Sequence, residues 1–271
     1  MRDLTNREGT VIKAEIVELT GEGTVKVIVK LKPYDIPLAS LSDEDQAWLK
    51  KWDLTQRLGE EAAHYNEEIF RDDFAAEGFG ERWGHYKSGS VVRDGVLVGI
   101  TPEGSDHSAV DNIKLDGRQD VQVMVRFRFV GSEGKSFNVW LDDKDYKESH
   151  AGHICSISIS PENLTISDAK TGQFANSIYE QTKSGAPLSD ELKAMLATKT
   201  ARFPLELSRD EWHSLVIRTK GDTTTVLIDE KEAGEFSSEG ISHDTKSLIS
   251  LTTNAVAVEY DDFSIHAAET E

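Results

Sequence analysis

The sequence predicts an all-β fold whose larger part is a jelly-roll sandwich of antiparallel strands. Two observations lead to this prediction. Beyond residue 69, about ten segments alternate apolar and polar side chains or form short apolar runs, with turn residues between them. Few of the intervening segments have helical periodicity, whereas a parallel sheet needs a crossover connection between its strands, usually a helix. We therefore expect one sandwich over residues 69–271.

A smaller β-domain is predicted over residues 1–41. Thr10–Glu18 and Thr24–Leu31 each alternate apolar with polar or charged side chains, which is typical of half-buried strands. The Thr20–Gly23 segment between them contains two glycines and predicts a turn. Tyr34–Leu38 is a third short strand, so we expect a three-stranded domain.

Residues 42–68 are predicted to form a helical linker. Ser42 is a residue type that caps helix N-termini, and three acidic residues follow it at the positive end of the helix dipole. Trp48, Leu49 and Trp52 continue the helical pattern.

The N-terminal region resembles a known family. Residues 2–9 are RDLTNREG, residues 12–17 are IKAEIV, and residues 36–49 are IPLASLSDEDQAWL. Together these motifs resemble the SLA1 homology domain 1 family over roughly residues 2–52. The resemblance implies a small SH3-like barrel. Eukaryotic members bind Asn-Pro-Phe-containing peptides, whereas bacterial copies occur in exported proteins, so a protein partner and a purely structural module both stay open.

The larger domain is predicted to begin near residue 69. Within it, Val121, Val123, Val125, Phe127 and Phe129 alternate with polar residues and should face one side of a strand. The predicted strands are Ile69–Phe74, Val91–Ile100, Asp120–Val130, Ser136–Leu141, His153–Ser160, Leu164–Ser167, Trp212–Thr219, Thr223–Asp229, Ser247–Leu251 and Val256–His266.

One long insertion, residues 168–204, interrupts these strands. It contains a predicted helix over Ser189–Thr198, with Leu192, Met195 and Leu196 along one side. Insertions of this length between strands are often functional.

Four motifs of the larger domain resemble concanavalin A-like lectin/glucanase domains, the LamG-like type included. They are IFRDDF (residues 69–74), GVLVG (95–99), DEWHSLVIRTKGDTTTVLIDEKEAG (210–234) and VEYDDFSIHA (258–267). Residues 137–168 resemble exported proteins of planctomycete-type bacteria, which are grouped with family-16-like or 3-keto-disaccharide hydrolase-like domains. The resemblance covers about 200 residues and implies the fold, without deciding the chemistry.

The charge balance excludes one class of partner. The chain carries a net charge of −19, and the residues beyond Gln56 hold 22 Lys and Arg against 39 Asp and Glu. Such a surface disfavours DNA and RNA, whose phosphates need basic side chains. A solvated acidic surface explains it, and part of it suits a Ca²⁺ or sugar site. No apolar run approaches the roughly 18 residues of a membrane span.

The only cysteine, Cys155, falls within an apolar strand pattern and is expected to be a buried thiol. A lone cysteine excludes an internal disulfide and a cysteine-based zinc site. Charged residues follow Met1 directly, so no signal peptide is recognised. We expect an exported protein, periplasmic or extracellular, whose leader has been removed, and a cytoplasmic location stays open.

The richest polar segment is Asn138–His153. Asn138, Trp140 and Asp142 share one face of an extended strand. Amide and carboxylate groups can hydrogen-bond sugar hydroxyls, and Trp offers a stacking surface. A solvated acidic loop is the alternative. The predicted ligand-binding residues are Asn138, Trp140, Asp142 and Asp143, and the candidate catalytic residues are His150, His153 and Asp142.

Four aspartates form a candidate Ca²⁺ site: Asp72, Asp73, Asp261 and Asp262, from the first and last strands of the sandwich. Ordinary turn aspartates are the alternative. The family-16 glucanase motif Glu-x-Asp-x-(x)-Glu is absent, because Phe263 and Ser264 follow Glu259-Tyr-Asp261 where the second glutamate belongs.

Three functions follow from these observations. The first is a non-catalytic protein that binds glycans or mediates cell-surface interactions. The second is a sugar-processing enzyme, a glycoside hydrolase or a 3-keto-disaccharide hydrolase- or lyase-like enzyme, that uses a His/Asp site. The third is a scaffold that binds a protein through its N-terminal domain. The expected partner is a carbohydrate or polysaccharide, with a protein or peptide as a further partner.

Overall fold

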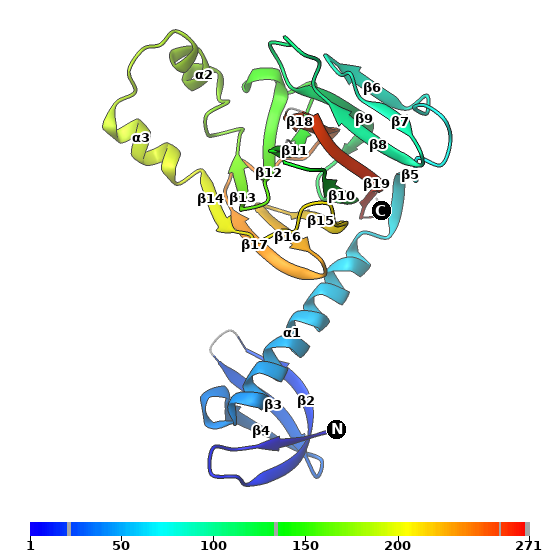
Figure 1. The fold of residues 1–271 in the computed structure, drawn as a ribbon. Coiled ribbons are helices and arrows are strands. Elements are labelled where there is room, and N and C mark those ends of the chain that lie inside the picture. Colours follow the sequence, from blue (N-terminus) through cyan, green and yellow to red (C-terminus); the bar gives the residue numbers. More distant parts are fainter. Residues whose placement is uncertain (21–22, 133–134, 255, 269–271) are drawn as a thin grey trace. The chain divides into compact units, whose positions relative to one another are not determined.

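The computed structural model of the chain describes residues 1–20, 23–132, 135–254 and 256–268. The chain divides into two compact units, Met1–His64 and Tyr65–Glu271, and each has its own apolar core (Figure 1). None of the described helices combines the length and the apolar character that crossing a bilayer requires.

The smaller unit is a four-stranded antiparallel sheet with a helix packed on it. The sequence predicted three strands, and Arg2–Thr5 adds a fourth because it pairs with the second strand. Among the described residues no ladder joins the first strand to the fourth, so the sheet is open rather than a closed barrel. Its elements are β1 (Arg2–Thr5), β2 (Val11–Leu19), β3 (Thr24–Val29), β4 (Lys32–Pro37), η1 (Leu38–Ser40) and α1 (Asp43–His64).

Helix α1 belongs to the core of this unit. The hydroxyl of Ser42 accepts a hydrogen bond from the backbone N–H of Asp45 at 3.2 Å, which confirms the predicted cap. Leu49 is fully buried in one cluster with Leu4 and Val25. The first turns of the predicted linker therefore stabilise the small sheet.

The larger unit is a sandwich of two antiparallel sheets, so the predicted jelly-roll fold class is confirmed (Figure 1). In the seven-stranded sheet the spatial order is β14–β13–β12–β11–β18–β9–β6. These strands are β6 (Trp83–Tyr86), β9 (Ala109–Arg118), β11 (Ser136–Asp142), β12 (His153–Ile159), β13 (Asn163–Asp168), β14 (Thr200–Pro204) and β18 (Lys246–Asn254).

The eight-stranded sheet has the order β17–β16–β15–β10–β19–β8–β7, and β5 pairs with β19. Its strands are β5 (Glu67–Asp72), β7 (Val91–Arg93), β8 (Val96–Ile100), β10 (Val121–Phe129), β15 (His213–Lys220), β16 (Thr223–Ile228), β17 (Lys231–Ser237) and β19 (Val256–Ala267).

The core lies between the two sheets and follows the predicted alternation. Val121, Val123, Val125, Phe127 and Phe129 are all buried there, as expected for one face of a strand. Cys155 is buried in the same core, and burial raises the pKa of its thiol to about 12, which makes it unsuitable as a nucleophile.

Some strands differ from the prediction. Val91–Ile100 is interrupted because Asp94 and Gly95 adopt positive φ angles of 53° and 78°, which turn the chain back on itself as a tight hairpin. The sequence prediction also missed four strands, namely β6, β9, β14 and β17.

The predicted insertion, residues 168–204, contains α2 (Asn176–Lys183) and α3 (Asp190–Ala197). The structure confirms the α3 cap, since the Ser189 hydroxyl accepts from the Leu192 N–H at 3.2 Å. The insertion ends in strand β14, and α2 was not predicted. In Figure 1 both helices lie outside the two sheets, beyond β13 and β14.

Candidate functional site

A groove of about 740 Å³ runs over the outer face of the seven-stranded sheet. Side chains alternate along each strand, so the residues between the core positions point outward. On β11, Phe137, Val139 and Leu141 are fully buried in the core. Asn138 and Trp140, which alternate with them, line the groove.

Strand register sets what stands beside each groove residue. Trp140 pairs with Ser250 on β18, and Ser250 pairs in turn with Asn112 on β9. Asn138 pairs with Thr252 in the next row. Ser250 and Asn112, which lie beside Trp140 on the neighbouring strands, have short side chains. The Trp140 indole therefore borders an open channel with polar residues along its floor.

These residues have no hydrogen-bond partners within the described part of the chain. There the side chains of Asn112, Asn138, Trp140, Ser250 and Thr252 make no hydrogen bond. None of their polar atoms is fully buried without a partner, so each keeps some contact with solvent in the groove, although Ser250 and Thr252 are only 3% and 5% exposed. Their donors and acceptors are therefore free for a ligand.

An aromatic wall closes one side of the groove. The ring centroids of Trp140 and His153 are 4.2 Å apart, and Phe174 packs on both, at 5.3 Å from Trp140 and 4.8 Å from His153. Tyr179 of α2 stacks on His150 with a centroid distance of 3.7 Å and an interplanar angle of 10°. All five rings line the groove.

A tight turn carries His150 and His153 to this wall. Ala151 has φ 56° and Gly152 has φ 76°, a left-handed conformation that favours glycine. A Cβ on Gly152 would lie 2.0 Å from the backbone oxygen of Asp143, so only glycine fits there. Ala151 lines the groove in a sparsely populated backbone region, a feature found at functional sites.

The start of the insertion is tied to the same turn. The backbone N–H of His150 donates to the carbonyl of Phe174 at 2.7 Å, and Asn176 N–H donates to the carbonyl of Glu148 at 3.0 Å. A bridge between Ser149 and Ala175 extends this pairing. These bonds hold Phe174 at the wall.

Asp142 and His153 form a pair at one end of the groove. Nδ1 of His153 lies 2.8 Å from Oδ1 of Asp142, and Asp142 is buried. Burial raises the pKa of Asp142, and the hydrogen bond and charge of His153 offset part of that effect. Burial lowers the pKa of His150, and the nearby His153 and Lys183 lower it further. Asp142 holds the His153 imidazole through Nδ1, so the second ring nitrogen, Nε2, is the one directed toward the groove.

Asp143, a predicted ligand-binding residue, does not line the groove. It is buried beside the 243–247 segment, where its carboxylate lies 2.9 Å from Nε2 of His243 and accepts hydrogen bonds from Thr245 and Ser247. Burial alone would raise the pKa of Asp143, but these hydrogen bonds lower it to about 2. The chain turns at the end of β11 and carries Asp143 away from the groove. Asp143 is therefore a structural carboxylate.

Two of the predicted calcium ligands hold the start of the sandwich. Asp72 accepts from the backbone N–H of Phe74 and from the indole Nε1 of Trp83, both at 2.8 Å. Asp73 accepts from the Ala75 N–H at 3.1 Å. Both carboxylates thus make the hydrogen bonds of ordinary turn aspartates.

The other two predicted ligands face an arginine. Oδ2 of Asp261 lies 3.1 Å from Nη1 of Arg126, and Oδ2 of Asp262 lies 3.5 Å from it. Over the described residues, no three His, Cys, Asp or Glu side chains are arranged to hold a metal ion. The geometry does not fit a preformed calcium site, and calcium binding stays a prediction.

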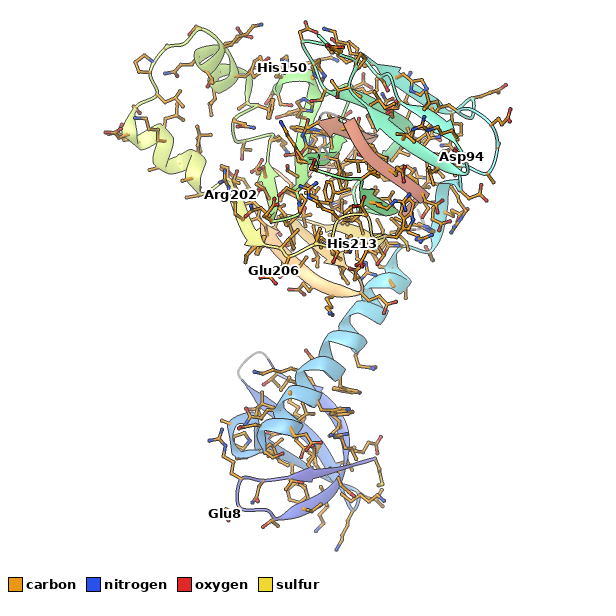
Figure 2. The ribbon with its side chains drawn as sticks, viewed as in Figure 1. Glu8, Asp94, His150, Arg202, Glu206 and His213 are labelled. Carbon is orange, nitrogen blue, oxygen red and sulfur yellow. The ribbon has the colours of Figure 1, made fainter. Side chains whose placement is uncertain are left out.

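The partial glucanase motif lies outside the groove. Glu259 and Asp261 are on β19 of the eight-stranded sheet, paired with Arg128 and Arg126. His213 is hydrogen-bonded to Asp229 and lies apart from His150 (Figure 2).

The groove itself offers only two carboxylates among its described lining residues, Asp106 and Asp142. Asp142 lies beside Leu248, and the loop that carries Asp106 reaches Asn254 through Ser108. Leu248 and Asn254 are six residues apart on one strand, about 20 Å at the usual rise. Glycosidase carboxylates are separated by only about 5 to 9.5 Å.

The structure thus brings together Asn138, Trp140, Asp142, His150 and His153, and excludes Asp143 from the groove. Sequence reasoning missed the groove residues that other segments supply. No local pattern marks them, since short polar residues on a strand are common and α2 was not predicted. The missed residues include Asn112, Phe174, Tyr179, Ser250 and Thr252.

No family model matches the chain, and no curated protein matches it in sequence. Solved structures do match its fold. The laminarinase from Rhodothermus marinus is 12% identical with a TM-score of 0.52, over 75% of this chain and 98% of that one. SCLam, a non-specific endo-β-1,3(4)-glucanase from family GH16, is 12% identical with a TM-score of 0.51, over 75% of this chain and 91% of that one.

A sialidase is 10% identical with a TM-score of 0.53, over 91% of this chain but only 21% of the sialidase. At these identities the similarity shows the fold alone. The larger unit therefore has the concanavalin A-like sandwich that the sequence motifs implied.

Proposed function

We propose that the protein binds a glycan in the groove over the seven-stranded sheet. The observation that carries the proposal is the convergence of Asn138, Trp140, Asp142 and His153 in one open groove. An indole face stacks on the apolar face of a sugar ring, and amide, hydroxyl and carboxylate groups beside it bind the sugar hydroxyls. The names of the glucanases with this fold add support, since those proteins act on carbohydrates.

The geometry favours binding over the two-carboxylate hydrolysis of glucanases. The acidic residues of the groove, Asp106 and Asp142, lie near opposite ends of β18, too far apart to act on one glycosidic bond. The unpartnered polar side chains of the floor instead lie in two adjacent rows across β11, β18 and β9, where they can bind the hydroxyls of a sugar on the Trp140 indole.

A glycan array followed by calorimetric titration of the hits tests the proposal. Trp140→Ala should weaken binding at least about thirtyfold, because a central Trp commonly contributes 2 kcal/mol or more to an interface. Trp212→Ala is the matched control, since Trp212 lies on the eight-stranded sheet against Arg126 and Arg128. Absence of any bound glycan, or an equal loss in both variants, would contradict the proposal.

The Asp142–His153 pair favours a second candidate, an enzyme acting on the bound sugar as a hydrolase or lyase. In this role Asp142 orients the ring and Nε2 of His153 accepts a proton as general base. Sampling the bound glycans for products over time separates the two functions. Products that form with the wild type and not with His153→Asn would favour the enzyme. If the glycans stay unchanged, the protein binds glycans without processing them.

We also propose that the protein works outside the cell, where polysaccharides are its partners. The resemblance of residues 137–168 to exported proteins supports this location. A peptide partner of the smaller unit and the scaffold function stay predictions from the sequence.

A further inference from the structure

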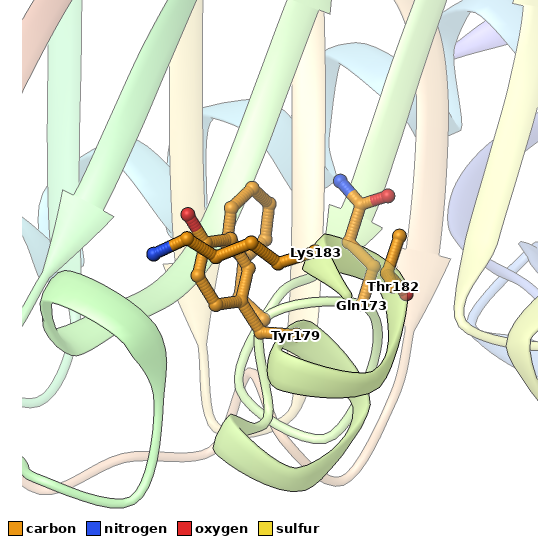
Figure 3. Close-up of a pocket in the computed structure, with 5 residues that line it drawn as sticks. Gln173, Tyr179, Thr182 and Lys183 are labelled. Atoms are coloured by element: carbon orange, nitrogen blue, oxygen red, sulfur yellow. The ribbon is translucent and has the colours of Figure 1, made fainter. Parts of the chain in front are cut away.

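A second cavity continues the groove beyond its aromatic wall. It has a volume of about 290 Å³ and is lined by Gln173, Phe174, Tyr179, Thr182 and Lys183, all from the insertion (Figure 3). Phe174 and Tyr179 line both this cavity and the groove. A ligand in the groove would therefore reach the cavity on α2 across these two rings.

The cavity carries a lysine without an acidic partner. The aliphatic chain of Lys183 lies across the Tyr179 ring in Figure 3, and its Nζ is 5.9 Å from the ring centroid. In the described part of the chain no carboxylate lies within 4.0 Å of this Nζ. By contrast, Lys87 at the other side of the groove is paired with Asp106, and Lys193 on α3 is paired with Asp190.

The carboxylates of the groove would not repel an anion strongly. Asp106 is paired with Lys87. Asp142 is hydrogen-bonded to His153, and its burial raises its pKa and so disfavours its charged form. The chain as a whole is acidic, with a net charge of −19. At physiological ionic strength, however, exposed charges are screened beyond about 8 Å, so the nearest charges decide the local preference. Lys183 lines the cavity, whereas Glu180, three residues earlier on α2, does not.

A polar amide completes this end of the site. The exposed side chain of Gln173 makes no hydrogen bond to a described residue, and Figure 3 shows it beside Thr182, across the cavity from Nζ of Lys183. The Thr182 hydroxyl is already engaged, since it donates to the carbonyl of Ile178 at 2.9 Å. Lys183, Gln173 and the hydroxyl of Tyr179, which makes no hydrogen bond to a described residue either, are therefore the donors available to a ligand.

We infer that the α2 cavity binds an anionic substituent of the glycan, a sulfate ester or a uronate carboxylate, with Lys183 as its cation. This inference rests on the proposed function and names the substrate class of the same groove. The neutral part of the glycan lies on Trp140, and the charged part extends past Tyr179 to Nζ of Lys183.

The test titrates the full chain with three classes of oligosaccharide of equal length: neutral, sulfated and uronate-containing. The wild type should bind one anionic class about three- to fivefold more tightly than the neutral class, the upper part of the range of an exposed charge pair. Lys183→Glu should remove that preference and leave neutral binding within twofold. Lys193→Glu, on an exposed lysine outside both cavities, should change neither.

The outcomes separate the two proposals. If the wild type binds no oligosaccharide of any class, the proposed function fails. If it binds neutral oligosaccharides as tightly as anionic ones, or if Lys183→Glu keeps the anionic preference, only the inference fails. A preference for sulfate over uronate, or the reverse, identifies which anion the cavity accepts.

Discussion

The two outward faces of the sandwich are both polar, but they use their polar side chains in opposite ways. On the eight-stranded sheet, Arg126 and Arg128 pair across strands with Asp261 and Glu259 and pack on Trp212. On the seven-stranded sheet, Asn138 and its neighbours have no partner among the described residues. The polar side chains of the first face bind one another, whereas those of the second face keep donors and acceptors available for a ligand.

This difference distinguishes a structural surface from a binding surface within one fold. A side chain with a protein partner contributes to stability, and its loss leaves that partner unsatisfied. A side chain without one is nearly neutral to stability and is available to a ligand. Replacing residues of the two kinds should therefore change different measured quantities.

The largest effect is expected at the neighbouring carboxylates Asp142 and Asp143. The folded protein holds the pKa of Asp143 near 2, below its ordinary 3.8, so its ionised form contributes stability above about pH 4 that is lost as the pH falls toward 2. Asp143→Asn should lower the free energy of unfolding by about 2 kcal/mol at pH 7, and the difference should shrink toward pH 2.

Asp142→Asn is the control for this experiment. Burial raises the pKa of Asp142, so the folded state favours its protonated form, and that contribution is lost as the pH rises above the ordinary carboxyl range. Its replacement should not lower the stability at pH 7. Urea unfolding of both variants between pH 2 and pH 7 measures the two effects. If Asp142→Asn loses more stability at pH 7 than Asp143→Asn, then Asp142 and not Asp143 is the structural carboxylate.

A smaller effect is expected when one amide from each face is removed. Gln122 accepts from Nε of the buried Arg218 at 2.8 Å, so Gln122→Ala should cost about 1.5 kcal/mol of stability and leave glycan affinity unchanged. Asn138→Ala should change stability by less than about 0.5 kcal/mol and weaken glycan binding about tenfold. Urea titration measures the free energy of unfolding, and calorimetry measures the glycan affinity. If both variants lose the same stability and the same affinity, the two faces do not differ in function.

The smallest effect concerns the cross-strand ion pair of Arg128 and Glu259. Nε of Arg128 lies 2.9 Å from Oε2 of Glu259, and both side chains are partly exposed. A double-mutant cycle with alanine should give a coupling energy of about 0.5 to 1 kcal/mol in unfolding. Neither single variant should alter glycan affinity. A measurable change in affinity would mean that this face also contacts the ligand.

Much of the sandwich was predictable from local patterns. The alternation along Val121–Phe129 predicted which side chains enter the core, and Ser189 predicted the start of α3. The hairpin at Asp94 and Gly95 was missed because the apolar residues on both sides were interpreted as one strand, although Asp-Gly between apolar runs is itself a hairpin signal. Helix α2 was missed because only one of its residues, Ile178, is buried.

The groove was predictable only along β11. The sequence by itself determined that Asn138, Trp140 and Asp142 share a face, since alternation is a local property of an extended chain. Only the tertiary structure decided what stands beside them: Ser250 and Asn112 in the row of Trp140, and the rings of the insertion at its wall. Strand order depends on the closure of long loops, and residue patterns within one strand do not encode it.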